Sequence, residues 1–366
     1  MAMDVYLPAS TSHREPGRYA PVRVAVVGLG YWGPNLVRNL QECGSSELVA
    51  VCDKRVDALE KIGRRYPAVK MTTDLADILE SDEIEAVAIA TPVATHHPIA
   101  AAALRAGKHV FVEKPLAFST AEALDLARLA DDHGRVLMPG HTFLYSPPVN
   151  WVRDIVQTRQ MGEIYFISMS RVNLGLHQSD ASVAWDLGPH DFSILHYWLG
   201  ETPRYVSAAS RGCIMPSIAD VAFITLEFES GMMAHVELSW LAPSKLRRTT
   251  IVGSEKMLVY DDTSNEPVRL FDSGVVMRDP ESFGEYKLSY RSGDIVSPHL
   301  DAAEPLLLEM TDYCDAIRLH QRPRSSRELG IEVVRMIEGV DRSLAAGGAR
   351  IDLLEVADEH PAALAA

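Results

Sequence analysis

The segment from Val22 to Gly33 constrains the fold more than any other part of the chain. It reads V-R-V-A-V-V-G-L-G-Y-W-G, a β-branched run followed directly by the pattern G-x-G-x-x-G. In this pattern Gly28 permits a tight turn, Gly30 lets the backbone approach a pyrophosphate, and Gly33 lets the next helix pack closely on the strand. Pro34 falls in the first helical turn, where a missing N–H is tolerated. The segment predicts the strand, turn and helix that open a dinucleotide-binding sheet.

An acidic residue lies at the distance from this turn that dinucleotide binding requires. A second predicted strand, Leu48 to Cys52, ends at Asp53, which stands 20 residues after Gly33. An acid at this distance accepts hydrogen bonds from the adenosine ribose, and its charge repels the 2′-phosphate of NADP. Asp53 therefore favours NAD. Lys54 and Arg55 follow immediately and could receive that phosphate instead, so NADP stays open as the cofactor.

Signals for strands and helices alternate as far as residue 138. Strands are predicted over Ala86–Ala90, Val110–Val112 and Val136–Met138, and helices over Leu75–Leu79, Pro98–Ala106 and Ala121–His133. This alternation predicts a parallel, doubly wound α/β sheet, a Rossmann fold. Ligands bind outside the carboxyl ends of the strands of such a sheet. The expected cofactor-binding residues are therefore Gly28, Gly30, Tyr31, Trp32, Gly33, Asp53, Lys54, Thr91, Pro92, His96, Glu113 and Lys114.

The predicted strand Val110–Val112 ends abruptly in Glu113-Lys114-Pro115. A charged pair and a rigid turn residue at the carboxyl end of a buried strand indicate a site. A solvated turn in which Glu113 merely pairs with Lys114 would give the same pattern. No metal site is predicted, because His96 and His97 lack a third ligand at a plausible spacing.

The pattern changes after His141. Strands are predicted over Tyr165–Val172, Tyr205–Ala209, Ala222–Phe228, Met232–Leu238, Thr249–Val252 and Met257–Tyr260. Their short connections predict an α+β domain with a large, mostly antiparallel open sheet. Helical periodicity over Glu304–Leu319 and Glu328–Leu344 suggests helices that pack back on the first domain. The expected division is a flexible tail over residues 1–20, a Rossmann domain over 21–140, a substrate and oligomerisation domain over 141–345 and a C-terminal tail over 346–366.

Composition limits the partners of the chain. The formal net charge of −15 over 366 residues disfavours nucleic acid and anionic membranes as partners. No apolar run has the length of a membrane span or of a signal-peptide core, so a cytoplasmic protein is expected. The four cysteines form no C-x-x-C pair and are expected to be reduced thiols. One face of the open sheet is expected to form a homodimer or homotetramer interface.

The second domain contains a candidate acid–base pair in the stretch W-D-L-G-P-H-D-F. Pro189 is predicted to start a helix, which would place His190 in the first turn and Asp186 just outside the helix. The positive end of the helix dipole disfavours imidazolium, and a neutral imidazole is what a general base requires. A purely structural contact between Asp186 and His190 is the alternative interpretation.

These motifs together resemble the Gfo/Idh/MocA family, which includes glucose–fructose oxidoreductase, inositol dehydrogenase and rhizopine-catabolism proteins. The resemblance spans residues 22–345 and rests on the glycine-rich turn, Thr91-Pro92 with His96, Gly107 to Pro115, and the pattern D-x-G-x-H. It implies that Lys114, Asp186 and His190 surround a reacting carbinol, with NAD as the hydride acceptor. The two glycines that often precede the aspartate are replaced here by residues around Ser182 to Trp185.

Within the family, the stretches His141–Pro147, Arg171–Gly175 and Ser239–Lys245 are similar to a branch that oxidises UDP-sugars at C3. The resemblance implies a UDP-glucose or UDP-N-acetylglucosamine type of substrate, and a role in amino-sugar or antibiotic-precursor biosynthesis. Arg247 and Arg248 are further candidates to meet an anionic nucleotide. Three other functions stay open: a keto-sugar reductase, an NAD-using glycoside hydrolase and a non-catalytic NAD sensor. The expected substrate contacts are His141, Tyr145, Arg171, Asn173, His177 and Lys245.

Overall fold

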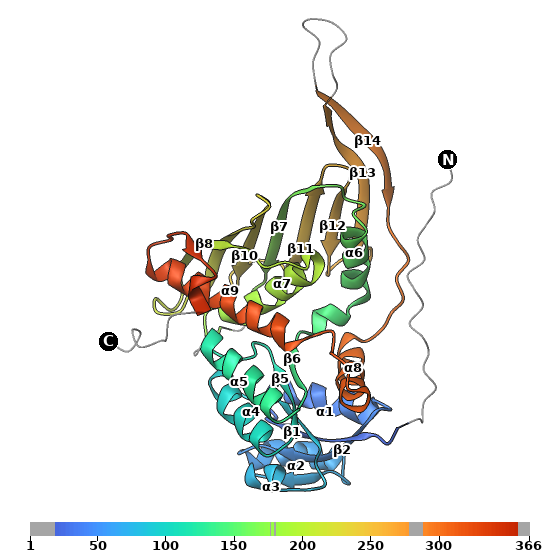
Figure 1. The fold of residues 1–366 in the computed structure, drawn as a ribbon, viewed down its shortest axis with the longest axis vertical. Coiled ribbons are helices and arrows are strands. Elements are labelled where there is room, and N and C mark those ends of the chain that lie inside the picture. The colour runs from blue at the N-terminus through green and yellow to red at the C-terminus, as the bar shows by residue number, and fades with distance from the viewer. Residues whose placement is uncertain (1–18, 176, 179–180, 278–287, 358–366) are drawn as a thin grey trace, which may run out of the picture. The chain divides into compact units, whose positions relative to one another are not determined.

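A computed structural model describes residues 19–175, 177–178, 181–277 and 288–357 (Figure 1). The chain divides into two compact units. The first unit comprises Met1–Ser146 with Ala303–Val334, and the second comprises Pro147–Ala302 with Arg335–Ala366. Each unit contains one sheet. Almost all of the tail predicted over residues 1–20 lies outside the described residues.

The first unit holds a six-stranded sheet of order β3-β2-β1-β4-β5-β6. Every neighbouring pair in it is parallel, which confirms the predicted doubly wound sheet. β1 and β4 lie side by side, and the strand order reverses between them, which makes the edge beyond their carboxyl ends the expected dinucleotide site. The strands are β1 (Val22–Val27), β2 (Ser46–Cys52), β3 (Lys70–Thr72), β4 (Ala86–Ile89), β5 (His109–Glu113) and β6 (Leu137–Gly140).

The central strands are apolar along their whole length. All four residues of β4 are buried, as are all but one of β1 and of β5. A parallel strand covered on both faces needs this continuous apolar sequence. The helices of this part are α1 (Gly33–Glu42), α2 (Val56–Arg65), α3 (Ala76–Leu79), α4 (His96–Arg105) and α5 (Thr120–Asp132).

A helix from the far end of the chain completes the first unit. α8 (Pro305–Leu319) packs against α1 and β1. Arg38 on α1 pairs with Glu304 just before α8, and Arg318 at the end of α8 pairs with Glu85. The division between the units falls inside α9 (Arg327–Ala345).

The second unit holds a nine-stranded sheet of order β14-β13-β12-β11-β7-β10-β9-β8-β15. Only β7 and β10 run parallel among its paired strands, so the predicted mostly antiparallel sheet is confirmed. β13 and β14, which form the long ribbon in Figure 1, were not predicted. The strands are β7 (Ile164–Val172), β8 (Tyr205–Arg211), β9 (Val221–Glu227), β10 (Met233–Ser239), β11 (Leu246–Gly253), β12 (Met257–Asp261), β13 (Val268–Met277), β14 (Leu288–Val296) and β15 (Ile351–Asp352).

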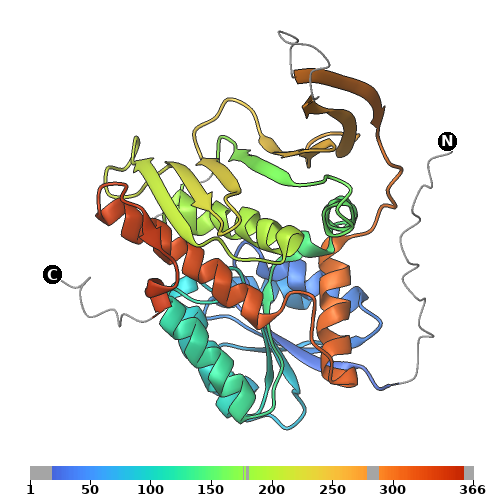
Figure 2. The same cartoon turned by 45° about the horizontal axis from the view of Figure 1, so that its top comes forward.

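Two helices of this unit, α6 (Pro147–Gln157) and α7 (Val183–Leu199), lie together over one face of the sheet (Figure 2). α7 contacts β7, β9 and β10, and α6 contacts β12. Large apolar side chains remain exposed elsewhere on the strands, among them Tyr165, Phe223 and Met233. In the described part of the chain, no helix is both long enough and apolar enough to cross a membrane.

The end of the chain departs from the prediction of a tail over residues 346–366. β15 pairs with β8, and Asp352 accepts hydrogen bonds from Arg204 at 2.6 and 3.0 Å. Leu353 and Val356 are buried. Residues as far as Val356 therefore belong to the packed unit, because this short segment closes one edge of the sheet. Residues 358–366 lie outside the described part.

Candidate active site and cofactor site

The glycine-rich turn has the geometry that a dinucleotide requires. Gly28 has φ +94°, and a Cβ there would lie 2.6 Å from the carbonyl oxygen of Ala90. A Cβ on Gly33 would lie 2.1 Å from the carbonyl oxygen of Gly28. Around Gly30, by contrast, no described atom lies within 4 Å of a Cβ position, so this turn leaves open space for a pyrophosphate. The residues present thus fit NAD.

Asp53 directly follows β2 and braces this turn. Its Oδ2 accepts a hydrogen bond from the Leu29 N–H at 2.7 Å, and its Oδ1 accepts one from the Arg55 N–H at 2.8 Å. Partial burial opposes ionisation, but the hydrogen bonds from Arg55 and Leu29 outweigh it and lower the pKa of Asp53. The guanidinium of Arg55 also bonds Asp53 and the Leu29 carbonyl. An ionised acid with Arg55 already engaged suits the ribose of NAD better than the 2′-phosphate of NADP.

His96 ties together the ends of two neighbouring strands. Its Nδ1 lies 2.8 Å from the Pro115 carbonyl oxygen after β5, and its Nε2 lies 2.9 Å from the Thr91 carbonyl oxygen after β4. Burial lowers the pKa of His96 despite these two acceptors. The side chain is 1% exposed, so it fixes the turns that carry Thr91, Pro92 and Lys114.

The charged pair at the carboxyl end of β5 consists of a buried residue, Glu113, and a half-buried one, Lys114. Glu113 is 8% exposed, and burial raises its pKa to about 7 despite the neighbouring Lys114. Lys114 is half-buried at the carboxyl end of β5. A solvated turn is therefore excluded for Glu113, while Lys114 keeps access to the edge of the sheet where ligands bind.

The structure corrects the predicted position of Asp186 and His190. α7 begins at Val183, not at Pro189, so both residues lie inside the helix and His190 is not in its first turn. The helix tolerates Pro189 because only one backbone hydrogen bond is lost, while Val183 and Trp185 bury apolar surface in the first turn. The dipole argument therefore does not apply to His190, because the positive end of the helix lies a turn or more away from it.

As a result, Asp186 and His190 lie one helical turn apart. Residues at i and i+4 share one face of a helix, and both are half-buried, Asp186 directly after the buried Trp185 and His190 directly after the buried Pro189. Trp240, just after β10, donates its indole N–H to Asp186 Oδ2 at 3.1 Å. A carboxylate held by an indole and a histidine on the same face can bind, orient and exchange a proton with a hydroxyl.

Trp240 also organises other predicted contacts of the second unit. Its carbonyl accepts a hydrogen bond from Gly175 N–H at 3.0 Å, and its ring centroid lies 5.3 Å from that of His177. The backbone N–H of Asn173 bonds the carbonyl of Ser239 next to it. Asp186 and His177 thus contact Trp240, and Asn173 bonds the residue before it. Trp240 was not among the predicted site residues. The stretch S-W-L-A-P-S-K contained the signal for it.

Other predicted substrate contacts are used within their own units. Arg171 is 4% exposed and bonds Asp191 through Nε at 2.5 Å and Nη2 at 3.2 Å. Tyr145 is buried, donates to Asp312 at 2.7 Å and accepts from the Ser325 N–H. Such buried pairs hold the fold and leave little capacity for a ligand. His141 is buried too, whereas Lys245 is exposed.

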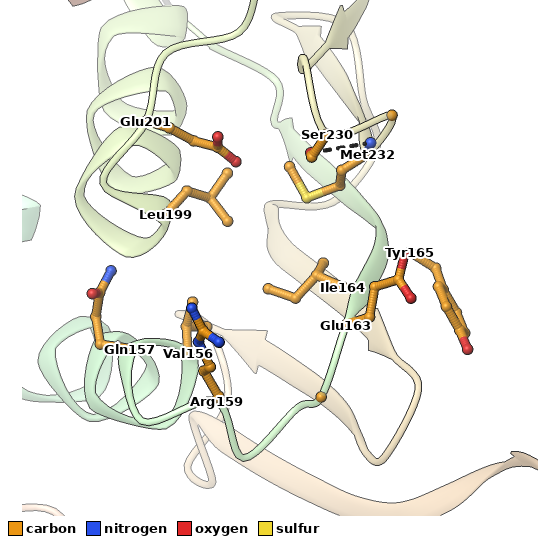
Figure 3. Close-up of a pocket in the computed structure, with 12 residues that line it drawn as sticks. Val156, Gln157, Arg159, Glu163, Ile164, Tyr165, Leu199, Glu201, Ser230 and Met232 are labelled. Atoms are coloured by element: carbon orange, nitrogen blue, oxygen red, sulfur yellow. Dashed lines mark hydrogen bonds between the residues drawn. The ribbon is translucent and has the colours of Figure 1, made fainter.

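The second unit also has an open cavity of about 490 Å³ at the ends of α6 and α7 (Figure 3). Glu201, Leu199 and Met232 point into it, while Tyr165 points away. None of the predicted site residues lines it. Among the described residues, no group of three or more His, Cys, Asp or Glu side chains is placed to hold a metal ion.

A parallel Rossmann sheet with this glycine-rich turn and an acid after β2 defines an NAD-binding oxidoreductase. The chain belongs to the Gfo/Idh/MocA family: residues 22–141 match its oxidoreductase NAD-binding Rossmann domain, and residues 149–259 match its C-terminal domain. NAD is therefore the cofactor, and the protein is an enzyme of the oxidoreductase class.

Two relatives match long parts of the chain. The uncharacterized oxidoreductase YrbE of Bacillus subtilis is 24% identical over 88% of this chain and 94% of its own length. The scyllo-inositol 2-dehydrogenase (NAD(+)) of the same organism is 29% identical over 69% of this chain and 77% of its own.

Solved structures show the same fold. GenD2 from gentamicin A biosynthesis, in complex with NAD, is 25% identical with a TM-score of 0.78 and covers 93% of this chain and 98% of that one. UDP-N-acetylglucosamine 3-dehydrogenase GnnA from Acidithiobacillus ferrooxidans is 23% identical with a TM-score of 0.73, covering 90% and 99%.

Proposed function

We propose that this oxidoreductase oxidises a secondary carbinol of a sugar to a ketone, at C3 of a UDP-sugar of the UDP-glucose or UDP-N-acetylglucosamine type. The observation that carries the chemistry is the pairing of Asp186 and His190 on one face of α7, with Asp186 held by Trp240. This arrangement supplies a base with a fixed carboxylate beside it, which alcohol oxidation needs.

His190 is the proposed general base. A hydride can leave the carbinol carbon only if the hydroxyl proton leaves as well, so a base must lie within hydrogen-bond reach of that hydroxyl. Asp186, one turn earlier, orients the substrate and the imidazole. The indole N–H of Trp240 donates to this carboxylate and fixes its position.

Lys114 is the proposed cationic donor. Its ammonium would stabilise the negative charge that develops on the carbinol oxygen as the proton departs. His96 sets its position, because it bonds the carbonyl of Pro115, the residue that follows Lys114. NAD, held by the glycine-rich turn and Asp53, supplies the hydride acceptor.

The identity of the sugar depends on how a nucleotide diphosphate would be neutralised. Of the four basic candidates, Arg171, Arg247 and Arg248 already pair with carboxylates of the second unit. Lys245 is exposed and has no hydrogen bond or ion pair with any described residue. We therefore assign the diphosphate contact to Lys245. The similarity to GenD2 and GnnA supports an amino-sugar or antibiotic-precursor pathway.

A cyclic polyol such as an inositol is the second candidate substrate. It carries no charge, so the three paired arginines need not be released for it to bind. The scyllo-inositol 2-dehydrogenase among the relatives supports this candidate. A homodimer or homotetramer in the cytoplasm is proposed in either case, with the exposed apolar side chains of the sheet as the interface.

Comparison of kcat/KM for UDP-sugars, the corresponding free sugars and scyllo-inositol distinguishes the two candidates. For a UDP-sugar enzyme, Lys245→Ala raises KM for the UDP-sugar by about tenfold and leaves any activity on free sugars unchanged, because one charge-assisted contact is lost. Lys61→Ala, at an exposed lysine of α2, is the control. Equal activity on free and nucleotide sugars would favour a cyclic polyol as the substrate. Consumption of NADH by a keto sugar alone would make the enzyme a reductase.

A further inference from the structure

Two buried carboxyl groups of the first unit have no role in the mechanism above. Glu113 ends β5 and is 8% exposed, and Glu309 on α8 is 0% exposed. Carboxyl groups this deeply buried are uncommon unless a cation or several donors accompany them. Neither group makes an ion pair with a described residue through its side chain.

The packing of β5 against α8 places the two carboxyl groups on facing surfaces. Phe111 and Glu113 point to the same side of β5, because residues two apart in a strand share a face. Glu309 and Tyr313 share a face of α8, because they are four residues apart. The rings of Phe111 and Tyr313 meet with centroids 5.8 Å apart. Glu113 and Glu309 therefore lie beside this ring contact, on the facing surfaces of β5 and α8.

The chain after β6 connects the two groups as well. Gly140 pairs with Glu113 in the sheet, and a Cβ on Gly140 would lie 3.1 Å from Glu113 Oε2. Two residues later, the Thr142 hydroxyl donates to Glu309 Oε2 at 2.7 Å. One short backbone segment thus lines both carboxyl groups.

Each group has one oxygen that lacks a hydrogen-bond donor among the described residues. Among the described residues, Oε1 of Glu113 and Oε1 of Glu309 have no hydrogen-bond partner. An ionised carboxylate needs donors on both oxygens when water is excluded, and two adjacent carboxylates repel each other. Burial raises the pKa of Glu309 well above its usual range, and the charge of Glu113 raises it further.

The surrounding charged groups do not neutralise this pair. Lys114 is a cation whose charge acts on Glu113, and Asp312 adds a further negative charge near Glu309. Buried His141 lies in the segment between Gly140 and Thr142. Other titratable groups near α8 have partners of their own: Arg38 with Glu304, Arg318 with Glu85, Tyr145 with Asp312, and Cys43 with Thr311.

We propose that Glu113 and Glu309 form a buried carboxyl pair that shares one proton and takes up or releases it when the charge of the bound nicotinamide changes. The oxidised nicotinamide ring is cationic and the reduced ring is neutral. Glu113 lies at the carboxyl end of β5, on the edge of the sheet where the dinucleotide binds. An ionised pair therefore favours NAD⁺ over NADH, and a protonated pair removes that preference.

Thermodynamic linkage between proton binding and cofactor binding allows this proposal to be tested without any sugar substrate. If the charge of the nicotinamide alters the affinity of the pair for a proton, pH must alter the relative affinity for NAD⁺ and NADH by the same factor. The inference rests only on NAD binding, so it survives if the proposed sugar substrate is wrong. Glu309 acts here as a positioning residue that tunes the preference between the two cofactor forms.

The test measures dissociation constants of NAD⁺ and NADH from about pH 6 to about pH 8, around the pKa of about 7 for Glu113. In the wild type, the ratio Kd(NADH)/Kd(NAD⁺) rises with pH, by up to about tenfold for each unit by which the two complexes differ in pKa. Glu309→Gln flattens this rise to under about twofold, since the amide cannot titrate. Glu60→Gln, at an exposed position of α2, keeps the wild-type profile.

Two results would overturn the proposal: a wild-type ratio that does not depend on pH, or a Glu309→Gln variant with the full wild-type slope. Lys114→Met distinguishes the carboxyl pair from Lys114 as the source of the pH dependence. If the slope of Kd(NADH)/Kd(NAD⁺) against pH disappears in that variant and persists in Glu309→Gln, Lys114 is the source. If Glu309→Gln does not fold, calorimetry of the wild type in two buffers of different ionisation enthalpy decides. NADH must bind with more proton uptake than NAD⁺, and equal uptake contradicts the proposal.

Discussion

The guanidinium of Arg318 at the end of α8 donates two hydrogen bonds to the carboxylate of Glu85 just before β4. Nη1 lies 2.8 Å from Oε1, and Nη2 lies 2.9 Å from Oε2. Arg318 also donates to the carbonyls of Ala20 and Pro21 before β1. A late helix is thereby fastened to the first strands of the Rossmann sheet. This contact explains how residues after the second domain still belong to the first unit.

This pair predicts a specific acid sensitivity. The hydrogen bond from Arg318 lowers the pKa of Glu85 to about 2 from its usual 4.5. Because the folded-state pKa is the lower one, the stabilisation is complete above about pH 4.5 and disappears as pH falls toward 2. We expect Arg318→Met to lower the free energy of unfolding by about 1–2 kcal/mol at neutral pH, allowing for partial exposure. Urea unfolding at neutral pH and near pH 3 should show a smaller effect in acid; an equal effect would contradict this assignment.

Asp53 provides a prediction for cofactor choice. Asp53→Asn should weaken NAD⁺ binding by about tenfold to a hundredfold, because a charge-assisted contact is lost and the Leu29 turn loses part of its support. NADP⁺ should be affected less, since the repulsive charge is gone. Fluorescence titration measures both affinities. Asp57→Asn, at an exposed carboxylate paired with Lys61, is the matched control and should leave both unchanged.

Variants of the proposed catalytic residues should separate chemistry from binding. His190→Ala should lower kcat by about 10²–10⁴-fold, the range for a lost general base, with NAD⁺ affinity unchanged. Lys114→Ala should lower kcat by a similar factor through the loss of charge stabilisation. Steady-state kinetics with the best substrate measures this, and turnover near that of the wild type in either variant would refute the assignment.

Arg171 is expected to contribute to the stability of the second unit more than to substrate binding. Arg171→Met leaves Asp191 buried without its partner and should destabilise the second unit by about 3–5 kcal/mol. The double variant Arg171→Met/Asp191→Leu should recover most of this loss, because no buried charge remains. Thermal unfolding of the three proteins tests this. A double variant as unstable as the single one would show that Arg171 stabilises through other contacts.

The local patterns of the first unit could be predicted from sequence because each depends on neighbouring residues. The turn at Gly28, the acid at Asp53 and the buried run of β5 follow from steric freedom, spacing and continuous apolar sequence. The start of α7 could not be predicted in the same way. Pro189 looks like a start signal, but burial of Trp185 against the rest of its unit outweighs one lost hydrogen bond.

Contacts between distant parts of the chain were beyond sequence reasoning. β13 and β14 contain Gly274 and Gly293 and lack a regular alternation of polar and apolar residues, so their strand character depends on pairing with each other. The bond between Trp240 and Asp186, and the neighbouring positions of Glu113 and Glu309, exist only once helices and sheets have packed. These are also the contacts that carry the proposals about the site.

The central claim is that a hydride passes from a sugar carbinol carbon to NAD, and isotope transfer tests it most directly. The best substrate among the UDP-sugars, free sugars and scyllo-inositol, carrying deuterium at the carbinol carbon, would be turned over with NAD⁺ and the reduced cofactor analysed by mass spectrometry. We predict one deuterium in each reduced nicotinamide formed. Reduced cofactor without deuterium, or the release of a free sugar with no net reduction of NAD⁺, would contradict the claim, the second result pointing to the hydrolase.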